Sequence, residues 1–210
     1  MQQTLLIFIK NPELGKAKTR IAQAVGDEKA LQIYLELLAH TRKVAKAVNA
    51  NRHLYYSRFI DESDEWTRQD FQKFLQSKGT LGTRMAQAFQ TAFQTSEKVL
   101  IIGSDCASLS TEIVTKAFDA LDRHDFVLGP ATDGGYYLLG MKKFQPSVFE
   151  AIAWSTAQVF PTTIQRIEAL EQSYFLLPEL SDIDHWEDWL KYGWKISFAL
   201  SFSASLASLA

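Results

Sequence analysis

Short apolar runs recur along most of the chain, separated by segments of mixed polarity. The run at 4–10 is apolar almost without interruption, as strands buried on both faces of a parallel sheet are. Further strands are predicted at 53–57, 98–104, 125–130, 135–141 and 173–177. Most of these runs are short enough to be single strands of one sheet.

The segments between the apolar runs carry a helical period. Leu31, Tyr34, Leu35 and Leu38, for example, form a stripe with the spacing of an amphipathic helix. Helices are predicted at 18–48 with a break near Gly26, at 83–94, at 110–123 and at 157–172. The segment 61–76 is polar and then amphipathic, and no strand is assigned to it. Repeated alternation of strands and helices predicts an α/β fold with a single, mostly parallel central sheet flanked by helices.

The composition narrows the class of protein. A chain of 210 residues with 47% hydrophobic and 22% charged residues is expected to form one soluble domain with a full core. The net charge of −2 gives no overall attraction to nucleic acid or to an anionic membrane. The single cysteine, Cys106, excludes an internal disulfide and is expected to be a small buried residue of a cytoplasmic protein. The first residues lack the pattern of a signal peptide.

The loop after the first predicted strand is basic. Residues 10–20 contain Lys10, Lys16, Lys18 and Arg20, with Gly15 among them. A glycine, basic side chains and a helix start suit phosphate binding, because backbone N–H groups and the helix N-terminus add positive potential. The spacing matches neither the Walker A nor the G-x-G-x-x-G motif. A solvated basic helix start explains the pattern equally well.

The third predicted strand is followed by a carboxylate, Asp105. Burial of an unpaired carboxylate is costly, so Asp105 is expected either to cap the next helix or to bind a charged group. Ser108 and Ser110 lie nearer to that helix and are better placed to cap it. The other interpretation is a ligand of Mg²⁺, which takes one or two carboxylates and completes its shell with phosphate oxygens and water. A second carboxylate is available in the acidic segment 180–190, which is otherwise a solvated helix start.

A glycine pair, Gly134 and Gly135, follows the fourth predicted strand and is preceded by Asp133. These glycines would let the backbone pass close to a ligand, and Asp133 could accept hydrogen bonds from hydroxyl groups. A plain Asp-Gly hairpin turn is the alternative. Because ligands bind at the carboxyl ends of parallel strands, we expect Lys18, Asp105 and Asp133 to lie around one cleft.

Six segments, taken in this order, resemble one protein family. They are FIKNPELGKAKTRIA (8–22), GTLGTRMAQAF (79–89), LIIGSDCASL (100–109), LGPATDGGYYLLGM (128–141), IAWST (152–156) and LSDIDHWEDWL (180–190). Together they resemble the bacterial glycosyltransferase-like family of the nucleotide-diphospho-sugar transferase superfamily, which has the GT-A fold. The chain is more distantly similar to the molybdenum-cofactor and 2-phospho-L-lactate guanylyltransferases.

The resemblance implies a GT-A-like domain over 1–192 that binds a nucleotide or nucleotide-sugar and a small-molecule acceptor. It implies that the nucleotide and its phosphates contact Gly15, Lys16, Lys18 and Arg20 of the first loop and Gly82 and Arg84 of a second one. It implies that Asp105 is catalytic and binds Mg²⁺ or Mn²⁺, with Asp184 as the second metal ligand. The loop facing the transferred sugar or acceptor would contain Asp133, a second catalytic candidate, with Gly134 and Gly135.

The chain departs from the superfamily in one place. The usual D-x-D motif is reduced to Asp105-Cys106-Ala107, without a second acid. Glycosyl transfer remains the expected activity. The alternatives are nucleotidyl transfer with release of pyrophosphate and a catalytically inactive nucleotide-binding module.

Several smaller expectations follow. The cations of residues 10–20 are expected to be unpaired, so Lys18→Ala or Arg20→Ala should weaken nucleotide binding and leave the melting temperature unchanged. Asp105→Asn is expected to be neutral or mildly stabilising, and the four histidines are expected to be structural or on the surface. The tail 193–210 is too polar for a membrane span and is expected to be a docked helix or a disordered end.

Overall fold

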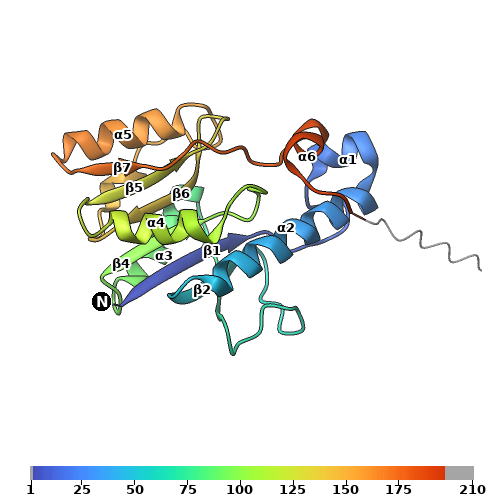
Figure 1. Cartoon of the computed structure of the whole chain (residues 1–210), viewed down its shortest axis with the longest axis horizontal. Helices are drawn as coiled ribbons and strands as arrows, with labels where there is room; N and C mark the ends of the chain where they lie inside the picture. Colours follow the sequence, from blue (N-terminus) through green and yellow to red (C-terminus); the bar gives the residue numbers. More distant parts are fainter. Residues whose placement is uncertain (1, 197–210) are drawn as a thin grey trace, which may run out of the picture.

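A central sheet organises the molecule. The computed structural model describes residues 2–196, and within them seven strands form one sheet in the order β3-β2-β1-β4-β6-β5-β7 (Figure 1). The strands are β1 (Gln3–Ile9), β2 (Asn51–Tyr56), β3 (Gln72–Leu75), β4 (Lys98–Ile102), β5 (Phe126–Pro130), β6 (Tyr136–Met141) and β7 (Tyr174–Leu176). β6 is antiparallel to both of its neighbours, and every other adjacent pair is parallel. The predicted α/β fold with a mostly parallel sheet is confirmed.

Helices cover both faces of this sheet. They are α1 (Thr19–Val25), α2 (Asp27–Ala47), α3 (Leu81–Ala92), α4 (Thr111–Ala120), the 3₁₀ helix η1 (Pro146–Phe149), α5 (Val159–Ala169) and α6 (Trp186–Tyr192). Successive side chains of a strand point to opposite faces, so Leu5 and Ile7 pack in a cluster with α2 and α4. Leu6 packs on the other face with α3, α5 and η1. The predicted long helix does break at Gly26, between α1 and α2.

A third apolar cluster fastens the end of the described chain to α1 and α2. Ile183 and Trp189 pack with Ile21, Ile33 and Leu37, and α6 lies beside α1 (Figure 1). Trp194 continues this contact against the His40 and Trp189 rings. The segment 180–184 is thereby brought next to the loop that precedes α1. The predicted tail 193–210 falls mostly outside the described residues, since 197–210 are not described.

Two details differ from the sequence prediction. Residues 72–75 form the edge strand β3 within a segment to which no strand was assigned, because four residues are too few to show a period. α3 begins at Leu81 rather than at 83, because the Thr80 side chain caps the helix by accepting a hydrogen bond from the N–H of Thr83.

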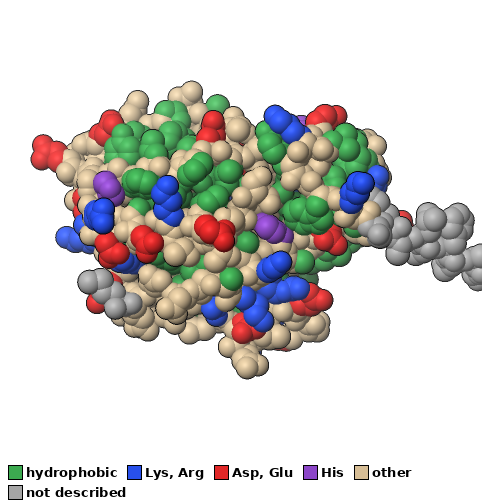
Figure 2. All heavy atoms as spheres, in the orientation of Figure 1, with side chains coloured by type: hydrophobic (Ala, Val, Ile, Leu, Met, Phe, Trp, Pro, Cys, Tyr) green, Lys and Arg blue, Asp and Glu red, His purple; other side chains and the backbone are tan. Residues whose placement is uncertain are grey.

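Among the described residues, no helix is both long and apolar enough to cross a membrane. Acidic and basic side chains are interspersed over the face shown in Figure 2, in keeping with the small net charge.

The strand order places a crevice between two loops. β1 lies between β2 and β4, and the chain leaves β1 towards β2 on one side and returns to β4 on the other. Ligands of open α/β sheets bind where the strand order reverses in this way, outside the carboxyl ends of the strands. The loop after β1 contains Lys10 and Lys18, and the loop after β4 contains Asp105.

Candidate functional site

Three adjoining cavities open at this crevice, and Lys10 and Asp105 line all of them. The first cavity, of about 580 Å³, lies over β1, the loop after β2 and the start of α3. The second cavity, of about 600 Å³, lies over the 131–136 loop and the segments 154–159 and 181–188. The third cavity, of about 270 Å³, lies over the basic loop and includes Lys18 and Arg20. The prediction that Lys18, Asp105 and Asp133 surround one cleft is therefore confirmed.

Lys18 is the most tightly held cation of the site. Its Nζ atom lies 2.6 Å from Oδ1 of Asp105 and 3.6 Å from Oδ1 of Asp184. It also donates a 2.6 Å hydrogen bond to the carbonyl of Ile183. Only 7% of the Lys18 side chain is exposed, and its backbone has a left-handed φ of 51° at the start of α1. The loop before α1 is thus shaped around an ion pair and is not a solvated helix start.

The expectation that the basic loop is unpaired is wrong. Lys18 contacts two carboxylates, Arg20 lies 3.2 Å from Asp184, and Lys16 lies 2.7 Å from Glu13. The sequence did not reveal these pairs because the partners of Lys18 and Arg20 come from distant segments that only the folded sheet brings together. The expected neutral effect of Asp105→Asn assumed a carboxylate without a cationic partner. Asp105 has such a partner in Lys18, so the change is now expected to be destabilising.

Asp105 is positioned by its neighbours and does not cap a helix. The N-cap of the helix that follows is Ser110, whose side chain accepts a hydrogen bond from the N–H of Ile113, as predicted. The carbonyl of Asp105 accepts a 2.8 Å hydrogen bond from the N–H of Ile183, which ties the acidic segment to the β4 loop. Its carboxylate is half-buried and faces Lys18.

Tyr34 of α2 holds both loops, a role that its helical spacing did not reveal. Its hydroxyl accepts a 2.9 Å hydrogen bond from the N–H of Lys10 and donates one of 2.9 Å to the Lys10 carbonyl. It also lies 3.2 Å from Oγ of Ser104. Burial, with a smaller effect of Asp105, raises the pKa of this hydroxyl above its usual value, so it stays a neutral positioning group.

Three carboxylates converge on the cleft from the β4 loop and the segment 182–184. Burial raises the pKa of Asp182 to about 7, with nearby Asp105 contributing and Lys18 opposing the shift. Asp105 and Asp184 both contact the ammonium of Lys18, so together they present two carboxylate ligands to one cation. No group of three or more acidic, histidine or cysteine side chains suited to a metal ion occurs within residues 2–196. The two carboxylates fit Mg²⁺ or Mn²⁺ only if phosphate oxygens and water complete the shell.

The glycine pair forms a tight turn at the edge of the second cavity. The N–H of Gly135 donates a 2.8 Å hydrogen bond to Oδ1 of Asp133. Gly134 has φ +85°, and a Cβ atom added there would lie 2.5 Å from the backbone of Ala157. The 155–157 segment therefore packs directly on this turn. The Asp133 carboxylate is exposed and lines the second cavity.

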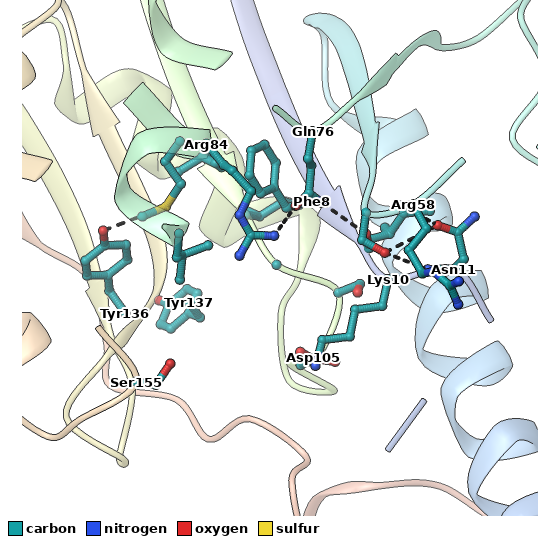
Figure 3. A pocket seen from close by; sticks show the side chains of 18 of the residues that line it. Phe8, Lys10, Asn11, Arg58, Gln76, Arg84, Asp105, Tyr136, Tyr137 and Ser155 are labelled. Atoms are coloured by element: carbon teal, nitrogen blue, oxygen red, sulfur yellow. Dashed lines mark hydrogen bonds between the residues drawn. The ribbon is translucent and has the colours of Figure 1, made fainter. Parts of the chain in front are cut away.

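The start of α3 lies beside both the first and the second cavity. A Cβ atom at Gly82 would lie 2.6 Å from the Trp154 ring, so this helix approaches the ring closely. Leu81 and Ser155 line both cavities. Arg84, one turn into the helix, donates a 2.8 Å hydrogen bond to Oε1 of Gln76 (Figure 3).

Other residues of the site carried no recognisable signal in the sequence. Asn11, Arg58, Gln76, Tyr136 and Trp154 all line the first or second cavity. The side chain of Asn11 donates to the Phe59 carbonyl and accepts from the N–H of Arg58, which joins the β1 and β2 loops. Cys106 is buried, and burial raises the pKa of its thiol, as a packing residue requires. Among the histidines, exposed His185 also lines the second cavity.

Comparison with known proteins gives a consistent result. The model of the family described as "Uncharacterized protein conserved in bacteria (DUF2064)" matches residues 38–156. A crystal structure from Desulfovibrio desulfuricans G20, of a protein provisionally designated a nucleotide-diphospho-sugar transferase, is 33% identical with a TM-score of 0.83. The match covers 88% of this chain and 84% of that one. No curated protein matches the chain.

More distant structures share the fold. The 4-diphosphocytidyl-2C-methyl-D-erythritol synthase of Anaerococcus prevotii DSM 20548 has a TM-score of 0.59 at 15% identity, covering 91% of this chain and 96% of that one. The inositol-1-phosphate CTP transferase of T. maritima has a TM-score of 0.57 at 14% identity, covering 89% and 91%. At these identities the likeness concerns the fold alone. The predicted resemblance to nucleotide-diphospho-sugar transferases is confirmed, and the fold is shared with these two cytidylyl-transferring enzymes.

Proposed function

The chain belongs to the DUF2064 family, and we propose that it is a metal-dependent glycosyltransferase that moves a sugar from a nucleoside-diphosphate sugar to a small hydroxyl-bearing acceptor. The observation that carries the proposal is the meeting of Lys18, Asp105 and Asp184 in the third cavity, which shares Asp105 with the other two. Cations and carboxylates in contact at a strand-order reversal are the groups that a diphosphate and its divalent cation require. The 33% sequence identity with the Desulfovibrio protein, which is provisionally designated a nucleotide-diphospho-sugar transferase, supports transfer from a nucleotide-sugar.

In this proposal each cavity holds one part of the two substrates. The nucleoside would lie in the first cavity, and its diphosphate would lie against Gly15, Lys16, Lys18 and Arg20. Asp105 and Asp184 would hold Mg²⁺ or Mn²⁺, which when bound stabilises negative charge on the diphosphate. The acceptor would lie in the second cavity, beside Asp133, Gly134 and Gly135.

The chemical step transfers the glycosyl group by substitution at its anomeric carbon. A hydroxyl oxygen of the acceptor forms a bond to this carbon, the bond from the carbon to the diphosphate oxygen breaks, and the nucleoside diphosphate leaves with the electron pair. Lys18 and Arg20 stabilise the charge that grows on the leaving oxygen. Asp133 is exposed in the second cavity, where it accepts hydrogen bonds from acceptor or sugar hydroxyls and receives the proton of the attacking group.

The charge of the second cavity favours glycosyl transfer over nucleotidyl transfer. Asp105, Asp133, Asp184 and Asp188 line it, together with Asp182, which is partly protonated at neutral pH because its pKa is raised to about 7, against the cations Lys10 and Arg20. An anionic phosphate acceptor, which attacks the α-phosphate of a nucleoside triphosphate in nucleotidyl transfer, would be repelled there. A neutral hydroxyl is not repelled. Both metal-ligand candidates are in contact with the same cation, which argues against an inactive nucleotide-binding module.

The released product distinguishes these functions. The protein, with Mg²⁺ or Mn²⁺ and a panel of acceptors that contains neutral sugars, polyols and sugar phosphates, is incubated with nucleoside-diphosphate sugars in one series and nucleoside triphosphates in another. We expect nucleoside diphosphate from the first series and no pyrophosphate from the second. Asp133→Asn is the matched variant, and it should lower the rate while leaving donor affinity unchanged. Pyrophosphate from the second series would establish nucleotidyl transfer, and neither product with any donor would support the inactive module.

A further inference from the structure

Arg84 is a cation without a carboxylate partner. Its guanidinium forms one hydrogen bond, to Gln76, and has no ion pair among residues 2–196. Its Nε atom is buried and finds no partner in this part of the chain. Figure 3 shows the guanidinium pointing into the first cavity between Gln76 and Tyr136, with Lys10 and Asp105 on the other side of that cavity. A half-buried guanidinium held in this way is arranged to meet hydrogen-bond acceptors of a ligand.

Gln76 fixes the direction of this guanidinium. It is 9% exposed, and its amide nitrogen donates 3.1 Å hydrogen bonds to the carbonyls of both Ile9 and Tyr55. These bonds use both amide hydrogens, so the oxygen of Gln76 must face Arg84, to which it lies 2.8 Å away. Gln76 has no donor left for a ligand. The polar face of this wall therefore consists of the remaining N–H groups of Arg84.

The wall of the first cavity around Arg84 is apolar, so an apolar part of the ligand is expected to lie against it. Phe8, Leu81, Met85 and Ile101 line the cavity, and the Tyr136 hydroxyl lies 3.9 Å from the Met85 sulfur, to which it donates. A phosphate would lie instead at the Lys10, Lys16 and Asp105 side of the cavity. A flat aromatic ring with polar atoms at its edge fits this apolar wall, because the ring can pack on the apolar side chains while its edge meets the N–H donors of the Arg84 guanidinium.

We propose that Arg84, oriented by Gln76, selects a nucleobase that presents a carbonyl oxygen, so that guanine, uracil or cytosine nucleotides bind in preference to adenine nucleotides. This inference rests on the proposed function. A guanidinium is a donor-only group, and it binds the paired acceptors of guanine well. Adenine presents an amino group beside the acceptor on both its Watson–Crick and its Hoogsteen edge, and this amino group would face the donors of Arg84.

The test compares four nucleoside diphosphates. Affinities of the protein for GDP, UDP, CDP and ADP are measured by calorimetry in Mg²⁺ with the wild type, Arg84→Met, Arg84→Lys and Arg58→Met. Arg58 is the matched control because it lines the same cavity and is already paired with Glu13. Melting temperatures establish that each variant is folded.

In the wild type, at least one of GDP, UDP and CDP should bind about tenfold or more tightly than ADP. Arg84→Met should remove most of this preference while changing the ADP affinity less than about twofold. Arg84→Lys, which keeps the charge but lacks the fork, should reduce the preference, and Arg58→Met should preserve it.

Each contrary result has a distinct meaning. A wild type that binds nucleotides without preferring a carbonyl base, or an Arg84→Met variant that retains the preference, would overturn this inference alone. An equal loss of affinity for all four nucleotides in Arg84→Met would make Arg84 a phosphate contact and would also overturn it. A wild type that binds none of the four would overturn the proposed function.

Discussion

Lys18 forms a 2.6 Å ion pair with Asp105, and it does so with a side chain that is only 7% exposed. The ammonium lies between the carboxylates of Asp105 and Asp184, in the place that a divalent cation would take. On the proposed function, a metal ion that binds these same carboxylate oxygens would displace the Lys18 ammonium. The phosphates of a nucleotide offer Lys18 another anionic partner, so metal and nucleotide should bind cooperatively.

Replacing Lys18 by methionine should destabilise the protein. The change leaves Asp105 without its cation and the Ile183 carbonyl without its donor. Because Asp105 remains partly exposed to water, the free energy of unfolding should fall by about 2 kcal/mol, less than for a fully buried pair. Urea denaturation measures this difference. An unchanged free energy of unfolding would mean that the pair contributes nothing to the fold.

Replacing Arg20, an exposed cation of the same cleft, should affect nucleotide binding but not stability. Its side chain is 64% exposed and, within residues 2–196, its ion pair is with Asp184, so Arg20→Ala should change the free energy of unfolding by no more than about 0.5 kcal/mol. Nucleotide affinity should fall, and the loss should be larger at low ionic strength because the contact with phosphate is solvent-exposed. Arg123→Ala, an exposed cation outside the three cavities, is the control. Equal affinities for Arg20→Ala and the control would remove Arg20 from the site.

Gly134 should tolerate no side chain. Gly134→Ala would place a Cβ atom 2.5 Å from the Ala157 backbone at a φ of +85°, which should cost about 1–3 kcal/mol of stability. Gly103→Ala is the matched control, since nothing lies within 4 Å of the added atom, and its effect should stay within about 0.5 kcal/mol. Thermal unfolding of both variants makes the comparison. Equal effects would show that the turn and the 155–157 segment are not packed as described.

The raised pKa of Asp182 predicts a pH dependence of stability. With a pKa of about 7 in the folded protein and an ordinary value of about 3.9 when unfolded, the folded state binds the extra proton between these values. Stability from this group is therefore lost as the pH rises through that window, by at most about 1.4 kcal/mol per pH unit. Asp182→Asn should remove this slope in metal-free buffer. Parallel pH profiles of wild type and variant, from pH 4.5 to 8, would contradict the shift.

The central strands of the fold could be predicted from the sequence because their burial requires a recognisable pattern. Buried parallel strands need nearly continuous apolar runs, and such runs at 4–10, 98–104 and 125–130 identified β1, β4 and β5. Loops after parallel strands share one edge of the sheet, so the meeting of Lys18, Asp105 and Asp133 at one cleft followed from order alone. β3 was missed because an edge strand of four residues shows no period.

The details of the site depend on side-chain geometry that spacing does not contain. Tyr34 was identified only as part of an apolar helical stripe, although its hydroxyl bonds the backbone of Lys10. The pairing of Lys18 with Asp105 depends on the left-handed backbone at Lys18, which nothing in the local sequence indicates. Gln76 ends the segment 61–76, whose amphipathic pattern does not mark this residue. Its role depends on hydrogen bonds to the carbonyls of Ile9 and Tyr55, which lie on two different strands.

The roles of Asp105 and Lys18 can be measured together. The affinity of the wild type for a nucleoside diphosphate is titrated with Mn²⁺ and again with a chelator, and both titrations are repeated with Asp105→Asn. A neutral amide is a poor ligand for a hard cation. The substitution also removes the nearest negative charge from Lys18. The variant should therefore be less stable than the wild type by about 1–2 kcal/mol.

In the wild type, Mn²⁺ should strengthen nucleotide binding about tenfold or more, and Mn²⁺ alone should bind weakly because Lys18 occupies its place. In Asp105→Asn the difference between Mn²⁺ and chelator should disappear. This result would support a metal-dependent nucleotide site built on Asp105. A variant that binds the nucleotide with undiminished dependence on Mn²⁺ would contradict it, and Asp105 would then be only the partner that holds Lys18 in the fold.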